Sequence, residues 1–181
     1  MDHPVFGLTQ TEFSVLLNAI GADELYGMVF EDIKDITEVH VFNAMNMMVQ
    51  KKILEPGDGA FIIDKEIKAL LMVIKNAFVA LSVSDKENTL PFKICYSDGK
   101  SVAVCEAKYV NKSELRLSVV SPDKFAEYLQ DEGYVLRTGC NITVRRLKPL
   151  KEEDVLEFEG LGIDEISDML TKHLTGKEEQ V

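Results

Sequence analysis

The sequence is poor in the residues that cross-link small proteins or bind metals. It has no Trp, only three His and only three Cys among 181 residues. The histidines are far apart and never occur in an HxxxH or HExxH spacing. An odd number of cysteines without CxxC spacing argues against a disulfide framework and against a zinc site; these are Cys95, Cys105 and Cys140. We therefore expect no metal, no cofactor and no disulfide.

Long apolar runs are also absent. The longest apolar-rich stretch, residues 69–83, is interrupted by Lys75, Asn76 and Ser82, and a membrane span needs about 20 apolar residues. Residues 1–4 lack the basic region followed by an apolar one that is typical of a secretory signal. We expect a cytoplasmic protein with no membrane insertion.

Positive charge is in deficit. Lys and Arg number 20 against 31 Asp and Glu, which gives a formal net charge of −11 and a pI near 4.8. Such a surface repels phosphates, so we expect no nucleic-acid partner. The signatures GxSxG, Walker A and GxGxxG are missing, and the sequence gives no reason to expect an enzyme.

What is present indicates a folded α+β domain. Thr9 and Glu12 form a capping box that predicts a helix ending near Gly21. A second helix is predicted over residues 38–51 with Thr37 as its cap, and a third over residues 65–76 with Asp64 as its cap. Between them lie a Gly-rich turn and a strand, residues 56–63. This order of elements predicts a winged-helix-like segment over residues 9–76.

The middle of the chain, residues 77–148, has the pattern of an antiparallel sheet. Strands are predicted as a meander, followed by a helix that begins at Ser121-Pro122 and a further strand. The turn at Asp98-Gly99 predicts a two-residue hairpin in which Cys105 faces Phe92. The predicted strands span residues 77–84, 90–97, 101–109, 114–121 and 141–147.

The C-terminal residues differ in charge. Residues 151–181 hold ten acidic residues and three lysines. Ile163, Ile166, Leu170 and Leu174 have the spacing of an amphipathic helix. We expect residues 151–176 to form an acidic helical segment of a single domain that spans residues 1–181.

The order of elements resembles a known family. The run from Leu8-Thr9-Gln10-Thr11-Glu12-Phe13 to Gly21-Ala22-Asp23-Glu24-Leu25 is similar to the opening of EspG-like proteins, and the likeness extends over roughly residues 6–132. These are cytosolic chaperones associated with ESX (type VII) secretion in Gram-positive bacteria. The resemblance implies a non-enzymatic chaperone or adaptor that binds a helical secreted protein, or the helical N-terminal domain of a toxin, before export.

Two other functions fit the same sequence. One is a winged-helix transcription regulator, and the other is an acidic immunity protein that neutralises a toxin. For partner binding, the Met-rich second helix, the acidic tail and the hairpin turn are the candidate segments, because flexible thioethers and an apolar centre with an acidic rim suit protein surfaces. For the methionines and the tail, helical spacing equally predicts packing in the core. The candidate residues are Met45, Met48, Phe158, Ile166, Met169, Asp98 and Gly99.

Overall fold

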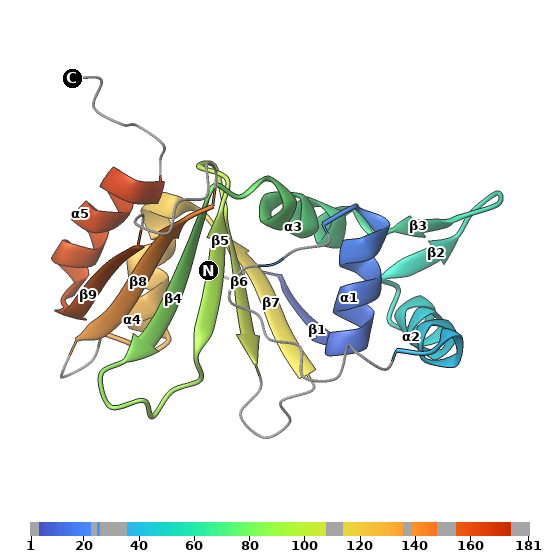
Figure 1. Cartoon of the computed structure of the whole chain (residues 1–181), viewed down its shortest axis with the longest axis horizontal. Coiled ribbons are helices and arrows are strands. Elements are labelled where there is room, and N and C mark those ends of the chain that lie inside the picture. Colours follow the sequence, from blue (N-terminus) through green and yellow to red (C-terminus); the bar gives the residue numbers. More distant parts are fainter. Residues whose placement is uncertain are drawn as a thin grey trace.

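The chain folds around one seven-stranded antiparallel sheet with strand order β1-β7-β6-β5-β4-β8-β9 (Figure 1). The computed structural model describes residues 4–22, 25, 36–107, 114–135, 139–147 and 155–174. The α+β class and the meander, which runs from β4 through β7, are confirmed. The strands are β1 (Val5–Thr9), β4 (Val79–Asp85), β5 (Lys93–Ser97), β6 (Val102–Ala107), β7 (Glu114–Val120), β8 (Cys140–Arg146) and β9 (Val155–Leu161).

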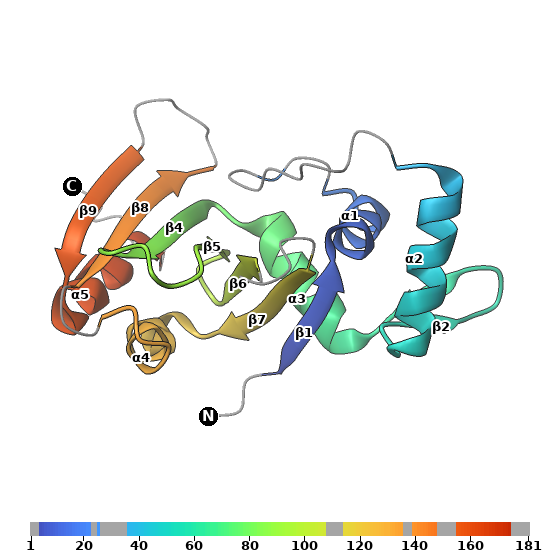
Figure 2. The same cartoon turned by 90° about the horizontal axis from the view of Figure 1, so that it is seen from below.

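Helices cover both faces of this sheet (Figure 2). Side chains alternate along each strand, so successive residues enter different cores. Ile94 and Tyr96 pack towards α1 and α3, whereas Cys95 packs towards α4 and α5. The first pair of helices is α1 (Gln10–Ala19) and α3 (Lys65–Asn76); the second pair is α4 (Phe125–Asp131), preceded by the 3₁₀ helix η2 (Pro122–Lys124), and α5 (Ile163–Leu174).

One helix and one hairpin project beyond the sheet. The helix is α2 (Glu38–Gln50), and the hairpin consists of β2 (Leu54–Pro56) and β3 (Phe61–Ile63). Figure 1 shows both at the end of the molecule opposite α5. The winged-helix-like segment over residues 9–76 is not confirmed, because α1 and α3 share the core of the main sheet.

Local sequence explains where these helices begin. The Thr9 hydroxyl accepts the Glu12 N–H at 3.2 Å, and the Glu12 carboxylate accepts the Thr9 N–H at 2.7 Å. Asp64 accepts the N–H groups of Glu66 and Ile67, at 2.9 and 3.2 Å. Each contact satisfies a backbone donor that the first turn of a helix leaves unpaired.

The edge strands and one register depart from the sequence-based prediction. β1 was not predicted. Residues 155–161 form β9, so the helix within the expected helical segment 151–176 covers only Ile163–Leu174 in the described residues. In the hairpin of β5 and β6, Ser97 pairs with Val102 and Ile94 pairs with Cys105. The prediction that Cys105 faces Phe92 is therefore wrong by two residues.

Candidate interaction surface

Helix α2 has apolar residues both on the side that packs on the protein and on the side that faces water. Its inner side packs on α1 and the core through Ala44 and Met48, which are 7% and 0% exposed. On its outer side, Val39 and Phe42 are each 65% exposed. Apolar side chains so far in water are normally scattered singly, and a group of them marks an interaction site.

The neighbouring hairpin adds to this apolar group. Ile62 is 59% exposed and Phe61 is 46% exposed, although both belong to β3. In the hairpin, Leu54 and Ile63 face each other at the base, where Leu54 is buried. The base is therefore anchored in the core while the tip carries its apolar residues into water.

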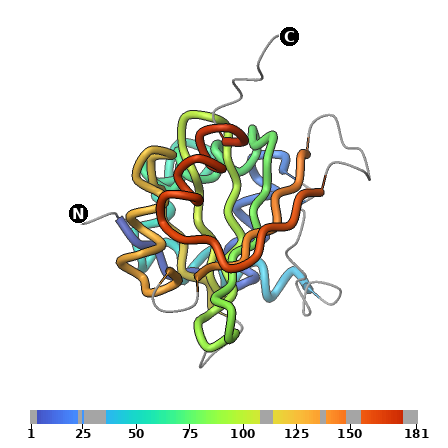
Figure 3. The backbone as a smooth tube through the Cα atoms, turned by 90° about the vertical axis from the view of Figure 1, so that its left-hand side faces the viewer, coloured from blue at the N-terminus to red at the C-terminus, as the bar shows by residue number. Residues whose placement is uncertain are grey.

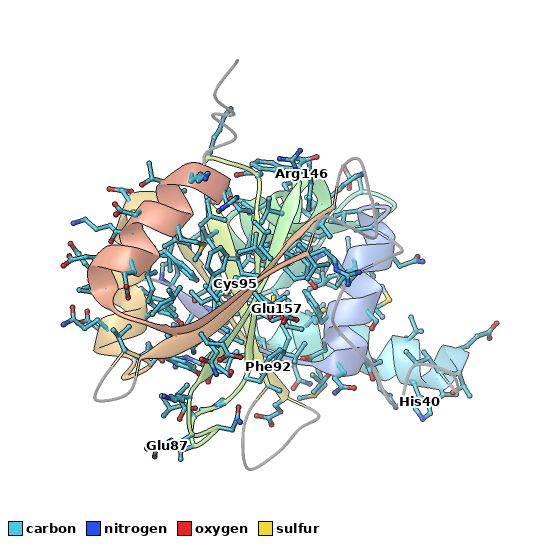
Figure 4. All side chains as sticks on the ribbon, turned by 60° about the vertical axis from the view of Figure 1, so that its left-hand side comes forward. His40, Glu87, Phe92, Cys95, Arg146 and Glu157 are labelled. Carbon is cyan, nitrogen blue, oxygen red and sulfur yellow. The ribbon has the colours of Figure 1, made fainter. Side chains whose placement is uncertain are left out.

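These residues lie on two neighbouring elements at the projecting end. Helix α2 contacts β2 directly, and Figures 1 and 2 both place α2 beside the hairpin. We call this the α2–hairpin surface. In Figure 4, His40 marks α2 at the far end from the body of the sheet, where Cys95 lies near the centre. The surface comprises Val39, Phe42, Met47, Phe61 and Ile62.

An ion pair holds α2 against the sheet. Lys51 follows α2, and its ammonium lies 2.9 and 2.7 Å from the two carboxylate oxygens of Glu12. The ammonium also donates to the Gly7 carbonyl at 3.4 Å. Glu12 is only 1% exposed, so this contact is partly shielded from water and fixes one end of the surface.

The sequence-predicted methionines divide between core and surface. Met48 is fully buried and packs in the core, so a role for its side chain in partner binding is wrong. Met45 is half-buried beside the same core. The exposed methionine of α2 is instead Met47, which was not among the candidate site residues. Spacing alone did not separate the sides of α2, because both are apolar.

The C-terminal candidates are mostly core residues. Ile166 is 0% and Met169 is 6% exposed, and both pack beneath α5 against the sheet. They are correctly placed on an amphipathic helix, but they cannot touch a partner without unfolding α5. Phe158 is half-buried, and its ring lies 6.2 Å from that of His173. Of these three, only Phe158 reaches the surface.

The Asp98-Gly99 turn has a structural task. Asp98 Oδ1 accepts the N–H groups of Lys100 and Ser101, both at 2.9 Å. Gly99 has φ of +85°, and a Cβ there would lie 3.1 Å from the Phe78 ring. The turn is therefore packed close to Phe78, and of the two candidate residues only the half-buried Asp98 has a polar side chain.

A row of charged residues crosses the sheet below α4, fully buried at Lys93 and partly exposed at Arg116. Lys93, Glu106 and Arg116 face one another on β5, β6 and β7. The Lys93 ammonium pairs with Glu106 and lies 3.5 Å from Glu132, while Arg116 lies 3.3 Å from Glu132. The Lys93 ammonium also lies 5.0 Å from the ring centre of Tyr134. Each charge in this row has an opposite charge beside it.

Burial determines the electrostatics of Lys93. Its side chain is 0% exposed, and this desolvation lowers its pKa, while the nearby Glu132 carboxylate acts in the opposite direction. The charged row therefore ties three strands to the end of α4. Sequence reasoning missed it because the predicted hairpin register placed Lys93 opposite Val104, whereas the observed register places it opposite Glu106.

Comparisons with known proteins add no family. The sequence matches no protein-family model and no curated protein. None of the helices in the described ranges has both the length and the apolar character needed to cross a bilayer. Among those same residues, no group of three or more His, Cys, Asp and Glu side chains could hold a metal ion.

Proposed function

We propose that this protein is a non-enzymatic adaptor or chaperone that binds a helical segment of a partner protein through the α2–hairpin surface. The observation that carries the proposal is the exposure of Phe42 and Ile62, at 65% and 59%, on two adjacent elements that project from the body. Large apolar side chains grouped in this way lose unfavourable contact with water when a partner covers them.

The proposed partner class rests on the resemblance of residues 8–25 to EspG-like proteins. On that basis, the client is a helical protein exported by type VII secretion, or the helical N-terminal domain of a toxin. An amphipathic helix is a suitable occupant, because its apolar side can cover both α2 and the hairpin tip. The alternative of an acidic immunity protein rests on the net charge of −11, through which it would mimic nucleic acid and block a single basic toxin.

The alternative of a transcription regulator has one observation in its favour. Helix α2 packs on α1 and is followed by a hairpin, as a recognition helix and wing would be. The exposed side of α2, however, presents Val39, Phe42 and Met47, and the hairpin turn contains no basic residue. Neutralising the charge of the phosphates needs Lys or Arg, whereas the exposed polar residues within α2 include Asn43 and Asn46.

The test is site-specific photocrosslinking from position 42 in the native cytosol, followed by mass spectrometry of the captured protein. Binding of that purified partner is then measured for Phe42→Asp and Ile62→Asp. We expect each substitution to weaken binding at least tenfold, because apolar anchors in such surfaces contribute about 2 kcal/mol or more. Leu156→Asp, at an exposed apolar position on β9, is the matched control and should bind normally.

Three outcomes distinguish the readings. Several helical export substrates support the chaperone, and a single toxin supports the immunity protein. Specific binding of promoter DNA at physiological salt by the parent protein, lost in both α2–hairpin variants, supports the regulator and overturns our proposal. Normal partner binding by both variants would place the partner surface elsewhere.

A further inference from the structure

The two ends of the sheet carry related strand–helix units. Residues 6–17, from β1 and α1, align without gaps with residues 159–170, from β9 and α5, and five of these positions are identical. Two further aligned pairs, Phe13 with Ile166 and Leu16 with Met169, are buried apolar residues in both units. The identical pairs are Gly7 and Gly160, Leu8 and Leu161, Glu12 and Glu165, Ser14 and Ser167, and Leu17 and Leu170.

The structure relates these units in space as well. β1 and β9 are the two edges of the sheet. Helix α1 lies over one face and α5 over the other, as a half-turn about the central strand β5 requires. The first turns also match: Glu12 accepts the Thr9 N–H at 2.7 Å, and Glu165 accepts the Gly162 N–H at 2.8 Å.

The units differ in what covers them. At the β1 end, α2 packs on α1, and Lys51 binds Glu12. At the β9 end, α4 and η2 pack on α5, but the side of α5 that carries Asp164, Glu165 and Asp168 is exposed. Figure 3 shows α5 in the foreground, facing the viewer. Glu12 is 1% exposed, whereas Glu165 is an exposed residue.

The side chains on the open side of α5 indicate what could cover it. Thr11 and Val15 of α1 are half-buried at the α2 end, and their counterparts on α5 are Asp164 and Asp168, both exposed. A helix that packed on α5 as α2 packs on α1 would therefore contact the carboxylates of Asp164 and Asp168, where α1 has the methyl groups of Thr11 and Val15. It would need basic residues along its inner side and a cation opposite Glu165.

We infer that the β9–α5 unit is a second docking site, for a basic helix of a partner protein that lies on α5 as α2 lies on α1. The internal template fixes the occupant as a helix, and the exchange of Thr11 and Val15 for Asp164 and Asp168 fixes its charge. Two features are not shared. Gly162, at the position of Thr9, has no hydroxyl to accept the helical N–H that Thr9 accepts, and Gly160 has φ of +65° at a bulge between the pairs made by Cys140 and Ile142. The inference therefore uses the Glu165 carboxylate and not the neighbouring backbone.

The probe is a synthetic copy of residues 37–52 in which Ala44→Lys and Met48→Lys make the inner side basic. Those two residues are the buried ones of α2, so the copy keeps the helix cap and the terminal Lys51. The control peptide has Ala44→Glu and Met48→Glu. Binding to the full-length protein is followed by fluorescence anisotropy at low and physiological salt, and the site is mapped by NMR of the labelled protein.

We expect the basic peptide to bind with shifts confined to β9 and α5, to weaken as salt rises, and to bind at least ten times more tightly than the acidic peptide. Asp168→Asn, which leaves the capping contact of Glu165 intact, and Glu165→Gln should each weaken binding about threefold to tenfold. Glu66→Gln, on the first turn of α3, is the matched control and should leave it unchanged.

The inference fails if the basic peptide does not bind, if its shifts map to the α2–hairpin surface, or if Asp168→Asn and Glu165→Gln bind as the parent does. Because α5 lies at the opposite end from α2 and the hairpin of β2 and β3 (Figure 1), this result is independent of the proposed function. Phe42→Asp should leave peptide binding intact even if it abolishes binding of the client.

Discussion

At the scale of single residues, Lys93 and its carboxylate partners are the most consequential polar group inside the protein. A buried charge that loses its partner is costly, since neither water nor another group replaces the lost interaction. We expect Glu106→Gln to lower the free energy of unfolding by about 3 kcal/mol, measured by urea denaturation. Glu132 remains 3.5 Å from the ammonium and limits the loss.

Two further variants test that explanation. Replacing Lys93 and Glu106 together with Met and Leu should restore most of the stability, because apolar pairs of similar size often replace buried ion pairs without loss. Glu127→Gln breaks the exposed pair between Lys124 and Glu127 and should change stability by less than about 1 kcal/mol. If Glu106→Gln and Glu127→Gln lowered the free energy of unfolding equally, burial would not explain the cost of breaking the Lys93–Glu106 pair.

The three cysteines predict how stability depends on alkaline pH. Burial raises the pKa of Cys95 and of Cys140 to about 12, and that of Cys105 well above its ordinary value. In the unfolded chain a thiol loses its proton near pH 8.5. Between that pH and about 12 the folded protein therefore binds more protons, and its stability falls as pH rises, by about 1.4 kcal/mol per pH unit for each thiol.

The measurement is the slope of unfolding free energy between pH 8.5 and 10 for the parent and for Cys95→Ala. The variant should show the shallower decline, whatever its absolute stability. Lys93, whose pKa burial lowers, contributes in the opposite sense, since it makes stability rise with pH below its unfolded pKa of about 10.4. Lys93 and Cys95 each shift the pKa of the other, so the difference between the two proteins reports the thiol together with this interaction. Identical slopes would mean that Cys95 is not protected.

At the scale of elements, the start of α3 offers a clear test of local sequence. Asp64→Ala removes the acceptor of two backbone N–H groups. We expect it to lower stability by about 1 kcal/mol, measured by thermal unfolding. Asp58→Ala, in the exposed turn of the hairpin, has no such task and serves as the control. A loss at position 58 as large as that at 64 would argue against the cap.

Helix α5 provides the second test at this scale. Ile166 is fully buried against the sheet, so Ile166→Ala should cost about 2–5 kcal/mol through lost burial and the cavity left behind. Phe42→Ala, at an exposed position of α2, should change stability by no more than about 0.5 kcal/mol. Denaturant midpoints measure both. If Phe42→Ala proved as damaging as Ile166→Ala, the α2–hairpin surface would belong to the core.

The elements that sequence predicted best are those with a local chemical signal. Thr9, Thr37 and Asp64 stand where α1, α2 and α3 begin, and hydrophobic alternation was enough to predict the central strands. β9 has no such signal. Its half-buried residues are Val155, Phe158 and Leu161, spaced three apart as in a helix, because a bulge opposite β8 disrupts the alternation.

The hairpin register shows a different limit. Asp98-Gly99 has the composition of a two-residue turn, but Asp98 accepts N–H groups from Lys100 and Ser101 and forms a four-residue connection. The packing of Gly99 against Phe78 and the backbone of Leu174 favours this connection. Both neighbours are distant in sequence from the turn, so composition alone could not predict the register or the Lys93–Glu106 pair.

At the scale of the whole molecule, the candidate surfaces required the fold. Residues 38–50 are apolar over most of the helix, and only the packing of α1 on one side shows that Phe42 faces water and Met48 does not. The sequence likeness of the β1–α1 and β9–α5 units indicates related packing only because the fold places them at the two edges of the sheet. The result is a protein with an apolar end and an acidic end, separated by the width of the sheet (Figure 1).

The thiols in the two cores, on opposite faces of the sheet, can report how often each face opens. Cys95 and Cys140 lie in one core and Cys105 in the other, and all three are free thiols. A thiol reagent reacts with each only when its side of the sheet opens. If Cys105 is modified at a rate unlike that of the other two, the faces open separately. Mass spectrometry of timed samples would then show whether partner binding at one end slows the opening of one face alone.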